Sequence, residues 1–176
     1  AGPSPPAASC DASGLLPDPS DKALALIDGV IGGSLPIPPN ALLEQTTGLS
    51  VEVWFRPSGS EPHGEMTSYG PQASSPFQPW VLQLNNAGSD FRILFYTSAV
   101  GSLMSSSTID VDKTYYLVGT FDGANLRIYL NGALDSVGGT AGALAGYDHD
   151  RGPGIWSGFL RRLPFRATPA RAAVST

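Results

Sequence analysis

The fold of this chain is decided by residues 113–132, KTYYLVGTFDGANLRIYLNG. Side chains alternate in character along 115–121 and again along 126–130, and a period of two places successive side chains on opposite faces of a β-strand. Between the runs, DGAN (122–125) supplies turn residues, because glycine accepts a positive φ and Asp or Asn can bond its own backbone. Asn131-Gly132 then closes the second run with the strongest short signal for a type I′ hairpin turn. The stretch therefore predicts a β-meander.

A second alternating run lies upstream in GLSVEVWFRPSG, residues 48–59. One face of this expected strand is apolar, and the other carries Glu52, Trp54 and Arg56. Because Trp54 lies opposite a buried row, we expect both faces to be partly covered, as at a sandwich edge or a concave binding surface.

The two stretches together resemble the laminin-G-like (concanavalin A-like) jelly-roll family. The similar features are Val-Glu-x-Trp followed by a basic residue and proline, and Phe-Asp-Gly followed by a strand that closes at Asn-Gly. The resemblance covers roughly Gly48 to Val137, about half of the chain. It implies a two-sheet antiparallel sandwich that binds glycans, proteins or calcium and is usually not catalytic.

Composition agrees with an all-β domain. The chain has 176 residues, 41% of them hydrophobic and only 14% charged, which suits one domain with a real core and many turns. No apolar run approaches the 18 residues of a transmembrane helix. We expect an all-β, two-sheet jelly roll with irregular Pro-rich N-terminal and basic C-terminal segments. The expected parts are an extended lead at 1–20, the jelly roll at 21–146 and a basic segment at 147–176, holding a divergent closing strand and a tail.

Charge is split along the chain. Residues 1–146 hold 13 acidic and 5 basic side chains, whereas residues 147–176 hold 2 acidic and 5 basic ones. A basic segment on an acidic domain suits docking on its own body or on an acidic neighbour. Nucleic acid is not an expected partner, because there is no lysine cluster and no interleaved aromatic platform.

Cys10 is the single cysteine, so no internal disulfide is possible. It lies in the lead AGPSPPAASC, which resembles the Pro-rich spacers of extracellular matrix or cell-wall proteins and favours an extracellular or cell-surface location. A lone cysteine in a secreted chain is either an unpaired thiol or an interchain disulfide, and Cys10 is the candidate for the latter.

Other strands are expected at 22–27, at 80–84 and 91–97 as a hairpin around 85–88, and, weakly, at 103–109. Residues 29–40 contain several prolines and suit an edge strand or a connection. Residues 58–79 are expected to form a long Gly/Pro/Ser loop, which in a compact domain is usually functional. The final residues lack the family's usual acidic closing strand, so either a divergent segment closes the sandwich or another chain supplies the strand.

Sequence signals for catalysis are sparse, and we expect no enzyme. His63 and His149 lie in separate loops, and no zinc or nucleophile motif is present. Glycosidases need two carboxyl groups flanking the scissile bond, but the Glu-x-Asp-x-x-Glu arrangement is missing. Glu61 and Glu65 are four residues apart in a Pro/Gly loop, where this spacing defines no shared face.

Calcium is the one cofactor candidate, because loop carboxylates suit a hard cation. Asp148 and Asp150 form the closest acidic pair in a late loop, and Asp110 and Asp112 form another. The more common role of such pairs is turn chemistry, in which Asp caps backbone N–H groups.

Glycan binding needs an exposed aromatic ring beside amide or carboxylate groups. Trp80 and Tyr69 are our first choice, with Asn85 and Asn86 as hydrogen-bonding partners, because Trp80 starts a strand directly after the long loop. Most aromatic rings in a sandwich are simply packing elements. The remaining aromatic candidates are Trp54, Tyr129 and Trp156.

Three interpretations follow. The first is a non-catalytic extracellular structural or adhesion module that contacts proteins, or copies of itself, within a larger assembly. The second is a carbohydrate-binding lectin-like module, and the third is a glycoside hydrolase on the same fold. The Pro-rich lead, divergent closing segment and basic tail favour the first.

Overall fold

The structure is a computed structural model that describes residues 8–13, 22–26, 34–36, 44–57, 64–69, 79–87, 90–139, 141–144, 153–156 and 165–169. Side chains are described for the parts of these ranges between 44 and 144. The described residues are all-β and contain no helix. The strands are β1 (Ala8–Ser13), β2 (Lys22–Leu26), β3 (Ser34–Pro36), β4 (Leu49–Pro57), β5 (Gly64–Tyr69), β6 (Trp80–Ala87), β7 (Asp90–Thr97), β8 (Gly101–Met104), β9 (Tyr115–Phe121), β10 (Leu126–Leu130), β11 (Ala133–Gly138), β12 (Pro153–Trp156) and β13 (Phe165–Pro169).

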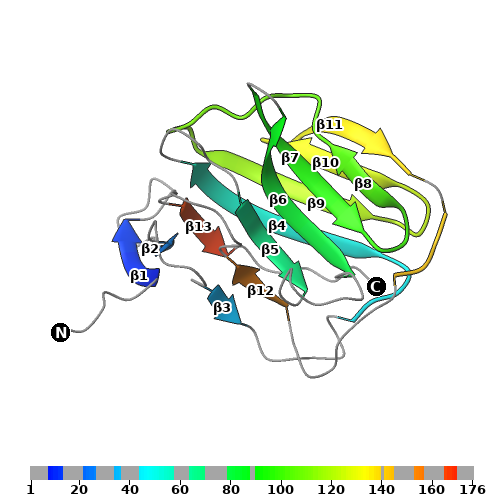
Figure 1. The fold of residues 1–176 in the computed structure, drawn as a ribbon, viewed down its shortest axis with the longest axis horizontal. Coiled ribbons are helices and arrows are strands. Elements are labelled where there is room, and N and C mark those ends of the chain that lie inside the picture. The colour runs from blue at the N-terminus through cyan, green and yellow to red at the C-terminus, as the bar shows by residue number, and fades with distance from the viewer. Residues whose placement is uncertain are drawn as a thin grey trace.

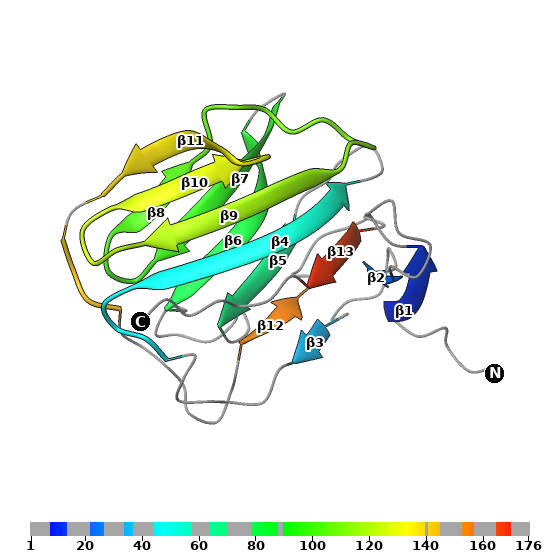
Figure 2. The same ribbon diagram turned by 180° about the vertical axis from the view of Figure 1, so that it is seen from behind.

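These strands form the two antiparallel sheets expected of a jelly roll. One sheet has seven strands in the order β1-β2-β13-β4-β9-β10-β11, and the other has six in the order β3-β12-β5-β6-β7-β8. Strands β5 to β8 face the viewer in Figure 1, and strands β4, β9, β10 and β11 face the viewer from behind in Figure 2. The expected all-β sandwich is therefore confirmed.

The core lies between the sheets and follows the alternation in the sequence. Every second residue of β4, β9 and β10 is buried, and the intervening residues are more exposed. Side chains of β6 and β7 fill the other side of the core. The fully buried apolar residues include Phe55, Leu117, Leu126 and Ile128 from the seven-stranded sheet and Leu82, Leu84, Ile93 and Phe95 from the six-stranded sheet.

The expected meander is confirmed. Strand β9 pairs with β10 from Leu126↔Phe121 to Leu130↔Leu117, and β10 pairs in turn with β11. Asn131 and Gly132 have φ values of 52° and 85°, as a type I′ turn requires. The Asn131 side chain also accepts a hydrogen bond from the Tyr116 N–H at 3.0 Å, which ties the turn to the start of β9.

The Asn131 turn leads to our first prediction. Asn131→Ala is expected to lower the free energy of unfolding by about 1–2 kcal/mol, because alanine tolerates the left-handed region poorly. Asn131→Gly accepts the same φ and loses only an exposed hydrogen bond, so its effect should be less than half as large. Urea unfolding of both variants measures the difference. If glycine destabilises as much as alanine, the side-chain hydrogen bond and not the backbone conformation controls this turn.

The chain supplies its own strands beside β4. Strand β13 lies between β2 and β4 and pairs antiparallel with both, from Phe165↔Pro57 to Pro169↔Val53 on the β4 side. Strand β12 pairs with β3 and β5 in the other sheet. Of the two alternatives for the closing segment, the structure has the arrangement of the divergent one, because β13 of the same chain occupies the position beside β4. Residues 1–20 also contribute a strand, β1, while the domain boundaries themselves stay a prediction.

The expectation of a long loop at residues 58–79 is wrong, because β5 lies within it. Strand β5 pairs with β6, and its register shifts between Glu65 and Thr67. The bulge breaks the period of two, so Glu65, Met66, Ser68 and Tyr69 are all buried and the sequence shows no alternation.

Two further strand boundaries differ from expectation. Residues 85–87 belong to β6 and pair with β7, so they are not part of the turn. Strand β8 ends at Met104, whereas the sequence favoured a strand at 103–109. Polar contacts beyond Met104 replace the ladder, since the Ser105 hydroxyl accepts the Ile93 N–H at 3.0 Å and the Ile109 N–H bonds to the Phe91 carbonyl at 2.8 Å.

A carboxylate connects the edges of the two sheets. Asp135 on edge strand β11 accepts the Ser106 N–H at 2.7 Å and the Ser107 N–H at 3.0 Å, just after edge strand β8. Burial alone would raise the pKa of Asp135, but hydrogen bonds from Ser106, Ser107 and Ser136 outweigh it and lower this pKa. The contact therefore contributes stability above the carboxyl's ordinary pKa and loses it as the pH falls through the lowered one.

Candidate ligand-binding face

A group of partly exposed aromatic rings lies on the outer face of the seven-stranded sheet. The outward residues of β4 alternate with the buried Val51, Val53 and Phe55, and those of β9 and β10 alternate in the same way. This surface is turned toward the viewer in Figure 2. We call it the aromatic face and define it by Glu52, Trp54, Tyr116, Arg127 and Tyr129.

Trp54 and Tyr116 form a stacked pair at the centre of this face. They are cross-strand partners on β4 and β9, and their ring centroids lie 4.7 Å apart with 26° between the planes. The Tyr116 hydroxyl donates a hydrogen bond of 2.9 Å to Oε2 of Glu52. This hydrogen bond, followed by burial, raises the pKa of Tyr116. The stacking and this hydrogen bond hold the rings in place. Both rings are partly exposed, so part of each ring is in contact with solvent.

Two cross-strand rows extend the face toward the edge strand. Glu52 pairs with Val118, which pairs with Tyr129 on β10. Thr120 lies opposite both Ser50 and Arg127 in the next row. These rows place a carboxylate, a phenol, hydroxyls and a guanidinium on the same sheet face as the stacked rings.

Arg127 is held in place by the turn after β9. It donates to Oδ2 of Asp122, whose Oδ1 accepts the N–H groups of Ala124 at 3.0 Å and Asn125 at 2.8 Å. The hydrogen bond from Arg127, followed by those from the Asn125 and Ala124 backbone, holds the pKa of Asp122 well below its usual range. The same ion pair raises the pKa of Arg127. Asp122 is therefore a turn residue that positions Arg127.

Tyr69 and Trp80 do not lie on this face. They are only 1% and 5% exposed, and both pack in the core between the sheets. The Tyr69 hydroxyl donates to Oε1 of Glu44 at 2.6 Å, whereas Trp80 Nε1 is buried and has no hydrogen-bond partner among the residues that the structure describes. The expectation that these rings are open to a sugar is therefore wrong, because Tyr69 belongs to a strand and Trp80 starts its strand facing inward.

Asn85 and Asn86 lie on neither the aromatic face nor a common face of β6. Asn85 is the partner of Arg92 on the outer side of the six-stranded sheet, and Asn86 is an exposed residue near the end of the β6–β7 hairpin. The four residues expected to form a glycan site thus do not come together.

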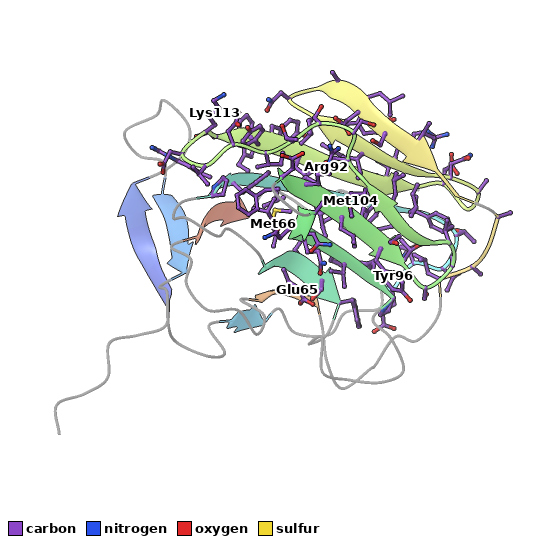
Figure 3. The ribbon with its side chains drawn as sticks, turned by 45° about the horizontal axis from the view of Figure 1, so that its top comes forward. Glu65, Met66, Arg92, Tyr96, Met104 and Lys113 are labelled. Carbon is purple, nitrogen blue, oxygen red and sulfur yellow. The ribbon has the colours of Figure 1, made fainter. Side chains whose placement is uncertain are left out.

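The outer face of the six-stranded sheet is partly closed. The outward residues of β6 include Val81, whose partner on β5 is Ser68, and Gln83, whose partner is Glu65. Although they point away from the core, Glu65, Ser68 and Val81 are all buried. Tyr96 and Met104, on the outer side of β7 and β8, are more accessible (Figure 3). Among the side chains that are described, this face therefore has one partly exposed aromatic ring, whereas the aromatic face has three.

The metal and thiol candidates have separate outcomes. Asp148 and Asp150 lie outside the described residues, and calcium binding there stays a prediction. Asp110 pairs with Lys113 at 2.7 Å, and no group of three potential metal-binding side chains occurs in the part of the chain described. Cys10 lies on β1, the outermost strand of its sheet, where the register shifts between Ser9 and Ala12. An interchain disulfide at Cys10 also stays a prediction.

Tyr116 was not among the site residues predicted from the sequence, although the signal was present. The alternation already placed Tyr116 on the outer side of its strand, and Glu52, Trp54 and Arg56 on the outer side of theirs. What the sequence lacked was the pairing of β4 with β9, which joins two segments about 60 residues apart into one surface.

The family of the chain follows from this fold and from sequence comparison. Residues 28–154 match the family model described as the concanavalin A-like lectin/glucanases superfamily, a laminin G-type model. The chain belongs to this superfamily. No curated protein matches the sequence.

Solved structures share the fold at low sequence identity. Domain 4 of AbnA, an extracellular arabinanase from Geobacillus stearothermophilus, in complex with arabinotriose, has a TM-score of 0.60 at 14% identity, over 92% of this chain and 75% of that one. A carbohydrate esterase from the Shiga toxin-encoding bacteriophage phi24B has a TM-score of 0.52 at 14% identity, over 91% and 87%. A sialidase has a TM-score of 0.50 at 12% identity, and this chain covers 15% of its length.

The fold thus occurs in lectins as well as in domains of carbohydrate-active enzymes, and it does not by itself separate binding from catalysis. The absence of activity stays a prediction. No helix within the described residues is long and apolar enough to cross a membrane.

Proposed function

We propose that this domain is a non-catalytic carbohydrate-recognition module that binds its ligand on the aromatic face. The observation that carries the proposal is the Trp54–Tyr116 stack beside Glu52 on a partly exposed sheet surface. A tryptophan ring covers the apolar side of a pyranose, and adjacent carboxylate and hydroxyl groups accept and donate hydrogen bonds to its hydroxyls. A few fixed polar groups around an apolar surface are the usual composition of a small-molecule site.

The rigidity of the face supports binding. Tyr116 is held by its ring contact and by its hydroxyl, and Arg127 is held by Asp122. Groups that are already ordered before binding lose little entropy when the ligand arrives. A preformed surface of this kind favours recognition of a sugar with a defined shape.

The arrangement of acidic groups supports a non-catalytic role. Hydrolysis of a glycosidic bond needs two carboxyl groups about 5–10 Å apart on either side of the bond. Strands β4, β9 and β10 contribute one carboxylate to this face, Glu52, while nearby Asp122 is engaged by Arg127 and the turn. Glu65, the buried acid on β5, lies in the other sheet.

The comparisons support the class of ligand without identifying it. The three structures described above come from proteins named for carbohydrate chemistry, and one of them contains arabinotriose. Their fold agrees with glycan binding and with an extracellular location for this domain.

Substitution of Trp54 tests the proposal. Affinity electrophoresis through a panel of neutral and acidic polysaccharides should show retardation of the native domain. Trp54→Ala should reduce affinity by about tenfold or more, as expected for truncation of a central aromatic contact. Tyr116→Phe, which keeps the ring and removes the hydrogen bond to Glu52, should have a smaller effect.

Tyr96→Ala is the matched control. It removes a partly exposed tyrosine from the outer face of the other sheet and should leave retardation unchanged. Thermal unfolding of each variant separates lost binding from lost folding. Retardation that depends on Tyr96 but not on Trp54 would move the site to the six-stranded sheet, and no retardation by any polysaccharide would overturn the proposal.

An adhesion module that contacts proteins is the second candidate. Leu134 and Val137 on edge strand β11 are each 55% exposed, and an apolar edge strand is a template for pairing with another chain. Light scattering with and without reductant tests self-association and Cys10 linkage together. Calorimetry with and without calcium tests the proposed site at Asp148 and Asp150. A domain that stays monomeric, and whose stability calcium does not raise, would exclude self-association, the Cys10 link and the calcium site.

A further inference from the structure

A second arginine, Arg56, lies next to the aromatic face on β4. Along the outer side of β4 the order is Glu52, Trp54, Arg56, and Arg56 is exposed. Alternate residues of a strand lie about 7 Å apart, roughly the length of one sugar unit with its substituents. A sugar on Trp54 therefore has a carboxylate at one end of its site and a guanidinium at the other.

Arg56 differs from the other cations whose side chains are described. Arg92 pairs with Asp90 at 3.8 Å, Lys113 pairs with Asp110 at 2.7 Å, and Arg127 pairs with Asp122. No ion pair involves Arg56 in the described part of the chain. Arg56 is exposed, so its guanidinium is accessible to a ligand from solvent.

The closing strand places a further arginine beside Arg56. In the β13–β4 ladder, Arg166 is the Cα partner of Arg56, and Thr168 is the partner of Trp54. Like charges at directly opposed positions of an antiparallel pair are unfavourable.

From this placement we propose that the preferred ligand is an acidic polysaccharide, with a sugar ring on Trp54 and its carboxylate or sulfate at Arg56, whose register partner on β13 is Arg166 (together the Arg56/Arg166 site). The inference rests on the proposed function and specifies its ligand class. Arginine suits both anions, because its planar donors match two oxygens at once. The chain has a net charge of −5, so its overall charge does not attract polyanions.

Matched polymer pairs test the inference. Polygalacturonate is compared with its fully methyl-esterified form, and dextran sulfate with dextran, so each pair differs mainly in charge. We expect at least one anionic form to bind about tenfold more tightly than its neutral partner, since hydrogen bonds to charged groups contribute about 1.5–3 kcal/mol. The first pair isolates the carboxylate and the second isolates the sulfate. Added salt should weaken the anionic binding selectively.

The variants are chosen to separate local from general charge effects. Arg56→Gln and Arg166→Gln should each remove most of the preference for the anionic polymer, whereas Arg56→Lys should keep part of it. Ser102→Asp is the control, because it lowers the net charge by the same amount at an exposed site on β8 in the other sheet. It should leave the preference unchanged.

The outcomes distinguish this inference from the proposed function. If both members of each pair bind equally and Trp54→Ala abolishes binding, the domain recognises glycans and the inference about charge is wrong. If Ser102→Asp weakens anionic binding as much as Arg56→Gln does, the effect comes from net charge, and the Arg56/Arg166 site is also wrong. If no polymer binds, both proposals fail.

Discussion

Phe95→Ala is expected to lower the free energy of unfolding by about 3–5 kcal/mol, the usual range for removing a buried phenylalanine ring. Phe95 is 0% exposed and lies at the centre of the core on β7. It contributes to packing between the sheets, because its ring reaches β9 of the opposite sheet. A loss of this size is a large part of the roughly 5–15 kcal/mol by which domains are stable.

Urea unfolding measures this loss, and Phe95→Leu is the control. Leucine keeps much of the apolar volume and should cost clearly less than alanine. If Phe95→Ala changed stability by less than about 1 kcal/mol, the two sheets would not pack through this ring. Phe95 would then not be a core residue that holds the two sheets together.

Gly119→Val is expected to destabilise the domain by about 1–3 kcal/mol, through overpacking. Gly119 faces inward on β9, and a Cβ atom there would lie 3.2 Å from Cδ1 and Cε1 of the Phe95 ring. The branched valine side chain would reach farther still. This result would be contrary to strand propensity, which favours valine over glycine.

A double variant identifies the cause. If the clash with Phe95 is responsible, Gly119→Val should cost less in a Phe95→Leu background than in the native domain, and the two effects should not add. Urea midpoints of the four proteins in this cycle provide the coupling energy. Strict additivity would show that Gly119 is required for a reason other than the ring.

The parts of the fold that could be predicted are those with regular alternation and marked turns. Strands β4, β9 and β10 show a period of two, and Asn131-Gly132 has the positive φ values that its residue types favour. Strand β5 could not be predicted, because the bulge at Met66 removes the alternation. The closing strand β13 was uncertain because FRATP has no strong pattern, and its place depends on pairing with β2 and β4.

The candidate site was only partly predictable for a related reason. The sequence alone determined that Trp54 and Tyr116 lie on the sides of their strands opposite the buried rows, because alternation is a local property of each strand. It could not determine that the two rings stack, that Tyr69 and Trp80 are buried, or that Arg166 lies opposite Arg56. Strand pairing and sheet packing join segments far apart in the chain, and only the tertiary structure decides which residues share a surface.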